Sequence, residues 1–162
     1  MYGVEIDPSA RALDDPDVFQ DNKICFMFGN EGDGLNAKAR STTVPVIILT
    51  GSDDSIALPE TAYEAYDALV NAPSKVIYRY NTDTHGAKAL KADHMAPIDD
   101  DGWMPSWAMD MLGGDGEVDT FDYRVFWAAL DAALDGQNTL TFNMGRWSDG
   151  VPVKAVTRLA PK

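Results

Sequence analysis

Apolar stretches alternate with polar, glycine-containing turns along the middle of this chain, and three of the stretches predict strands. The segment VPVIILTG (44–51) is rich in β-branched residues and apolar on both faces, which is typical of a strand buried between two layers of helices. KICFMFG (23–29) predicts a shorter apolar strand, and SKVIYRY (74–80) predicts a third.

Apolar residues recur at helical spacing in three other segments. Pro59 and Glu60 suit a first helical turn, and the repeat that follows predicts a helix over 60–71. A short helix is predicted over 104–112, and the best amphipathic helix covers 119–136, with an acidic first turn and a glycine stop.

The order strand, helix, strand forms a βαβ unit, whose strands are parallel. The fold class is therefore α/β, with a short parallel sheet of about three strands, flanking helices and an extended C-terminal tail. We divide the chain into an N-terminal extension (1–22), a domain (23–136) and a turn-rich tail (137–162). The extension is polar and broken by prolines, and predicts at most one helical turn near residues 10–13.

Composition narrows the classes of partner. The chain has 162 residues, 45% of them hydrophobic, which is enough for one globular domain. Its formal net charge of −13 repels phosphate backbones and anionic lipids, so we expect neither nucleic acid nor membrane insertion. The sequence has no apolar run of membrane-spanning length and no signal-peptide pattern, which favours a soluble protein of unknown compartment.

Candidate catalytic residues follow two neighbouring strands. Asp53 and Asp54 come directly after strand 44–51, and His85 follows strand 74–80. Because parallel neighbours end on the same edge of a sheet, we expect a carboxylate and an imidazole to meet there. Such a pair is the orienting half of a Ser-His-Asp triad, in which Asp54 would hold the ring of His85.

The stretch from VPVIILTGSDDSIALPETAYEAYDAL to THGA resembles the C-terminal half of an α/β-hydrolase, in particular the dienelactone hydrolase and cutinase-like esterases. The resemblance spans about residues 23–136 and implies that Asp54 is the triad acid and His85 the base. It also implies a small-molecule ester substrate. We expect no metal and no other cofactor. Some hydrolases of this class carry a GHM histidine followed by acids, so His94 in ADHMAPIDDD is a rival base.

Each candidate also has a purely structural interpretation. Asp54 is placed to cap the helix that follows it, and His85 could be a loop residue without a catalytic task. Trp103 and Trp107 could line a substrate pocket, or could pack their helix on the core. The acidic run at 99–101 indicates a solvated turn rather than a metal loop, and no His or Cys cluster has metal-ligand spacing.

The serine nucleophile is missing from this pattern. No serine lies in a G-x-S-x-G elbow, and Cys25 lies inside a predicted strand, where a thiol acts as a small hydrophobe. The strand 23–29 would also leave an apolar edge, which a protein partner, a missing N-terminal segment or residues 1–22 folded back over it should cover.

Two functions therefore stay open. The chain is the C-terminal portion of a serine carboxylic-ester hydrolase whose nucleophile lies elsewhere, or it is an inactive, hydrolase-derived interaction or accessory subunit of a larger assembly. An unrelated small-molecule-binding α/β domain is disfavoured, because no glycine-rich phosphate loop follows a strand.

Overall fold

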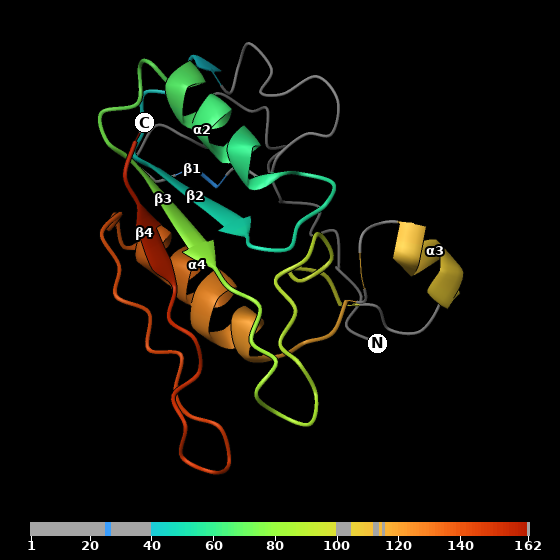
Figure 1. Ribbon diagram of the computed structural model, residues 1–162. Coiled ribbons are helices and arrows are strands. Elements are labelled where there is room, and N and C mark those ends of the chain that lie inside the picture. Colours follow the sequence, from blue (N-terminus) through green and yellow to red (C-terminus); the bar gives the residue numbers. More distant parts are fainter. Residues whose placement is uncertain (1–24, 27–39, 100–104, 112–113, 115, 162) are drawn as a thin grey trace, which may run out of the picture.

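A computed structural model describes residues 25–26, 40–99, 105–111, 114 and 116–161. The elements, in chain order, are β1 (Cys25–Phe26), β2 (Val46–Gly51), α2 (Pro59–Ala68), β3 (Lys75–Tyr80), α3 (Ser106–Met111), η1 (Asp122–Phe126), α4 (Trp127–Leu134) and β4 (Thr157–Leu159). Figure 1 shows one central sheet with α2 and α4 packed near it, and α3 apart from it. The predicted turn at 10–13 lies outside the described residues, and so does most of the predicted strand 23–29.

The strands are ordered β1-β2-β3-β4 in one sheet. β1 and β3 both pair parallel to β2, with Ile48 opposite Ile77, so the predicted parallel arrangement of three strands is confirmed. The prediction of a purely parallel sheet is wrong, because β4 pairs antiparallel with β3, where Arg158 lies opposite Tyr78. The tail returns along the free edge of β3 and makes the sheet mixed.

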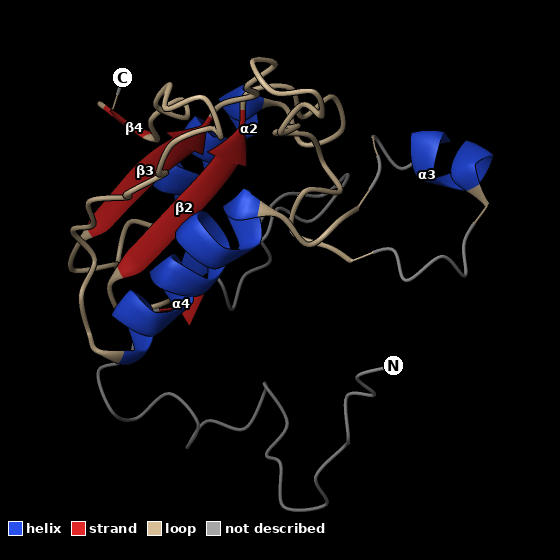
Figure 2. Cartoon of the chain, turned by 90° about the horizontal axis from the view of Figure 1, so that it is seen from below, coloured by secondary structure: helices blue, strands red, loops and turns tan. Residues whose placement is uncertain are grey.

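Helices cover both faces of this sheet (Figures 1 and 2). Successive side chains of a strand point to opposite faces, so Val46 and Ile48 pack with Leu69 of the α2 layer. Ile47, between them in sequence, packs with Ala133 of α4 on the other face. A strand in this position needs apolar residues throughout, which explains why 44–51 has no polar alternation.

Two helices differ in detail from their predictions. α2 ends at Ala68, where Leu69 leaves helical geometry (φ −84°, ψ 56°) and turns its side chain into the core. The predicted helix 119–136 contains a π-helical turn, η1, before α4 continues. Such turns hold an extra residue in the helix and often lie at functional sites.

The C-terminal tail is fixed to the body of the protein at several points. The hydroxyl of Tyr78 accepts a hydrogen bond from the N–H of Leu140 (2.8 Å), and its ring meets Phe142 edge to face at 5.1 Å. Asn81 donates to the carbonyl of Ala155 (2.9 Å) just before β4 begins. The tail is therefore an integral part of the fold.

Candidate functional site

Asp54 lies in the turn that leaves the carboxyl end of β2. Its Oδ1 accepts hydrogen bonds from the backbone N–H groups of Ile56 (3.0 Å) and Ala57 (2.8 Å). This side-chain-to-backbone turn fixes the direction of the carboxylate. The N-cap of α2 is Leu58, without a side-chain cap, so the alternative that Asp54 caps this helix is wrong.

The imidazole beside Asp54 belongs to His94. Its Nδ1 lies 3.1 Å from Oδ2 and 3.2 Å from Oδ1 of Asp54, within hydrogen-bond range. Both side chains are largely buried, with 18% of His94 and 11% of Asp54 exposed. The predicted meeting of a carboxylate and an imidazole at this edge occurs, but with the rival histidine.

The pairing of Asp54 with His85 was a wrong prediction, and the loop after β3 gives the reason. Asp83 and Leu90 form an antiparallel bridge through two backbone hydrogen bonds of 2.9 Å each. This bridge closes residues 84–89 into a separate loop, and His85 lies on that loop. The chain returns to the sheet only after Leu90.

The returning segment is held against the end of β2. The N–H of Ala92 donates to Thr82 Oγ1 (2.9 Å), and its carbonyl accepts from the N–H of Asp53 (3.0 Å). The approach requires glycine at position 51, because a Cβ there would lie 2.2 Å from the carbonyl oxygen of Ala92. These contacts set the position of His94, two residues further along.

A cavity of about 340 Å³ opens beside the Asp54–His94 pair. Its apolar walls include Ile48, Leu69, Ile98 and Phe126, and the described residues that line it contain no serine or cysteine. A volume and lining of this kind suit an apolar small molecule or an apolar segment of protein.

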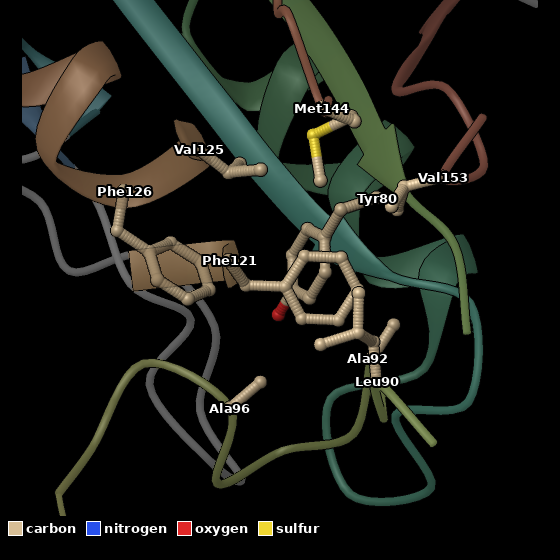
Figure 3. Close-up of a cluster of buried hydrophobic side chains, with 9 residues drawn as sticks. All are labelled: Tyr80, Leu90, Ala92, Ala96, Phe121, Val125, Phe126, Met144 and Val153. Atoms are coloured by element: carbon tan, nitrogen blue, oxygen red, sulfur yellow. The ribbon is translucent and has the colours of Figure 1, made fainter. Parts of the chain in front are cut away.

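Tyr80, the last residue of β3, forms part of the cavity wall and joins it to the core. Its ring meets Phe121 and Phe126 edge to face at 5.1 and 5.2 Å, as Figure 3 illustrates. Burial, reinforced by the charge of Asp54, raises the pKa of the Tyr80 hydroxyl well above its usual value. Tyr80 therefore stays neutral at any physiological pH. Sequence reasoning missed Tyr80 and Phe126 as wall residues, since each lies at an apolar position of its element.

His85 takes part in a second cluster, which joins the side loop to the tail. Its Nε2 lies 2.7 Å from Oδ2 of Asp149, and this contact lowers the pKa of Asp149. Oδ2 of buried Asp83 accepts from Trp147 Nε1 (3.0 Å) and from the N–H of Lys154 (2.9 Å). Burial alone would raise the pKa of Asp83, but these hydrogen bonds and one from the His85 N–H outweigh it and lower the pKa.

The structure describes only one of the two tryptophans that are predicted to bind substrate. Trp103 lies outside the described residues. Trp107 lies on α3, is 65% exposed and is not among the residues that line the cavity. α3 stands apart from the sheet in both views (Figures 1 and 2).

Within the described ranges, no group of three or more His, Cys, Asp or Glu side chains is arranged to hold a metal ion. No helix in the same part of the chain is long and apolar enough to span a bilayer. No family model, curated protein or solved structure matches this chain.

Proposed function

We propose that this chain carries the acid and the base of a serine-type carboxylic-ester hydrolase, with Asp54 as the acid and His94 as the base. The observation that carries the proposal is the buried contact of 3.1 Å between His94 Nδ1 and Asp54 Oδ2, at the edge of a cavity. A carboxylate at Nδ1 fixes the tautomer of the ring and stabilises the imidazolium that forms when Nε2 takes a proton.

The backbone supports this assignment of roles. Asp54 is anchored by two N–H groups, and His94 follows a segment pinned to β2 by the Asp53–Ala92 hydrogen bond. A catalytic base must be held within a fraction of an ångström of its working position. His85 is held less firmly, because 41% of its side chain is exposed and its partner lies on the tail. It also does not line the cavity.

The nucleophile comes, in this proposal, from another segment or chain that lies beside β1. In the described sheet β1 is an edge strand, with β2 as its one neighbour, and open edges of apolar strands need a cover. Ser52, two residues before Asp54, donates its hydroxyl to Asp53 (3.1 Å) and accepts from the N–H of Thr82 (3.0 Å). It has a structural task in the turn.

The test compares the two histidines, each of which contacts a carboxylate. The chain at high concentration should accelerate hydrolysis of 4-nitrophenyl butyrate above the buffer rate, with His94 as general base for water. His94→Gln should remove about 10²-fold or more of that acceleration, whereas the matched variant His85→Gln should leave it unchanged. An equal rate in His94→Gln, or a loss in His85→Gln, would contradict the assignment.

A fluorophosphonate probe tests where the nucleophile lies. The isolated chain should not be labelled, since the proposal places no activated serine in it. Labelling of a partner that co-purifies with the chain would support the proposal. An assembly that neither reacts with the probe nor turns over ester would instead support the second candidate, an accessory subunit without chemistry.

A further inference from the structure

Four large apolar side chains form an exposed row on the outer face of η1 and α4, here named the α4 stripe: Tyr123, Trp127, Leu130 and Leu134. Their exposed fractions are 60%, 47%, 46% and 64%. The rings of Tyr123 and Trp127 touch, with centroids 4.5 Å apart. In Figure 2 α4 lies in front of the sheet, and no other described helix or strand covers it from outside.

The inner face of the same helix is already used. Phe121, Val125, Ala129 and Ala133 are all buried against the sheet. A surface helix normally keeps its outer face polar, and a helix that is apolar on both sides is normally covered on both. The α4 stripe therefore has the character of an interface.

The spacing of the stripe points to another helix as its partner. Its members follow one another at intervals of four, three and four residues, which is the spacing of a coiled-coil seam. Two copies placed antiparallel would bring the aromatic half of one stripe, Tyr123 and Trp127, against the leucine half of the other. The stripe is complementary to itself in that orientation, as a two-fold interface requires.

The charges beside the stripe favour the same orientation. Arg124 is the sole basic residue between 119 and 136, and it lies on the same flank of the stripe as Asp131 and Asp135. All three residues are exposed. An antiparallel pair brings equal flanks together, so that Arg124 of each copy lies between the two acids of the other. A parallel pair would leave these charges without opposite partners.

The area of the stripe comes close to what a modest dimer needs. An aromatic side chain buries about 150–250 Å², so four half-exposed side chains offer about 400 Å² per copy. Two copies then bury about 800 Å² before the flanking residues are counted, close to the roughly 1,000 Å² at which specific interfaces begin. We propose that a second copy of this chain docks antiparallel on the α4 stripe and forms a two-fold symmetric dimer. This inference does not rest on the proposed hydrolase chemistry.

The first test is the mass of the full chain in solution. Analytical ultracentrifugation between about 1 and 300 μM should show a shift from the 17.7 kDa monomer to twice that mass. Leu130→Arg and Trp127→Gln should each raise the dissociation constant at least tenfold. Val70→Arg is the matched control, because Val70 is also an exposed apolar residue (76%) but lies beyond the end of α2; it should leave the constant unchanged. Circular dichroism would verify that each variant is folded.

The second test fixes the orientation by cross-linking in a Cys25→Ser background. In an antiparallel dimer, position 123 of one copy meets 134 of the other, while equal positions lie about 17 Å apart along the helices. The double variant Tyr123→Cys, Leu134→Cys should therefore oxidise to a covalent dimer, and neither single variant should.

Three results would overturn the proposal. The first is a monomer at every concentration. This includes a monomer in which acrylamide does not quench the fluorescence of Trp127 because a segment of the same chain covers it. The second is a dimer that Leu130→Arg does not weaken. The third is cross-linking of the single cysteine variants, which would mean a parallel pair.

Discussion

The substitution Gly51→Ala tests whether the close approach of the His94 segment to β2 creates the candidate site. Gly51 is the last residue of β2, and an added Cβ would lie 2.2 Å from the oxygen and 2.9 Å from the carbonyl carbon of Ala92. Both atoms belong to the backbone, so no side-chain rotation relieves the contact. The loop and the strand end must separate by about 1 Å to restore an ordinary distance.

The cost of that separation has two parts. Overpacking that moves backbone costs about 1–3 kcal/mol. Loss of the 3.0 Å hydrogen bond from Asp53 N–H to the Ala92 carbonyl adds about 1 kcal/mol. A total near 3 kcal/mol corresponds to a fall in melting temperature of about 6–12 °C for a chain of this size. Because Ala92 precedes His94 by two residues, the imidazole should also move away from Asp54.

Two measurements on Gly51→Ala check the expectation. Thermal unfolding followed by circular dichroism gives the loss of stability, and the ¹⁵N chemical shifts of the His94 ring give its tautomer and hydrogen bonding. Gly136→Ala is the control. A Cβ at position 136 meets no atom within 4 Å, but its φ of +73° is unfavourable for alanine. That variant should lose about 1 kcal/mol and leave the His94 signals unchanged.

One result would refute the reasoning. If Gly51→Ala unfolds within a degree or so of the unmodified chain and keeps its His94 ring signals, the contact with Ala92 does not define the loop. The positioning of His94 would then need another explanation.

Three further predictions concern stability. Asp83→Ala should cost about 2–3 kcal/mol, because it leaves the Trp147 and Lys154 donors without their acceptor. The pKa of Asp83 is lowered in the folded state, so its contribution to the free energy of unfolding should be present above about pH 4. That contribution should fade as the pH falls through the folded pKa, and urea unfolding at several pH values would measure it. Asp122→Asn should have the opposite effect, because burial raises the pKa of Asp122. The substitution should increase the stability of the folded protein at pH 7, and this increase should disappear at acidic pH. Tyr78→Phe should cost about 1–2 kcal/mol by removing the acceptor of the Leu140 N–H, which urea unfolding would also measure.

Local pattern was sufficient for the framework of the fold. The apolar run at 44–51 and the helical repeat that begins at Pro59 predicted β2 and α2 within a few residues. Such signals are local, since each residue's side-chain direction follows from the period of its own strand or helix. The antiparallel β4 was not foreseen, because its residues pair through backbone groups, and TRL carries no pattern of its own.

The candidate site could be predicted only in part from local sequence pattern. Asp54 follows its strand directly, so the sequence placed it at the correct edge. His85 and His94 both follow β3, and the sequence does not show which of them returns to Asp54. That choice depends on a bridge between Asp83 and Leu90. That bridge is held by backbone groups and by tail residues far away in the chain, such as Lys154.

By itself, then, the sequence determined the βαβ order, the acidic surface and the presence of one carboxylate and two candidate imidazoles near one edge of the sheet. The tertiary structure decided which imidazole meets Asp54, through the bridged loop and the space left by Gly51. It also decided that Tyr123, Trp127, Leu130 and Leu134 remain on the surface. The physical reason is that residue type fixes what a side chain can do, whereas backbone hydrogen bonds between distant segments fix where it is.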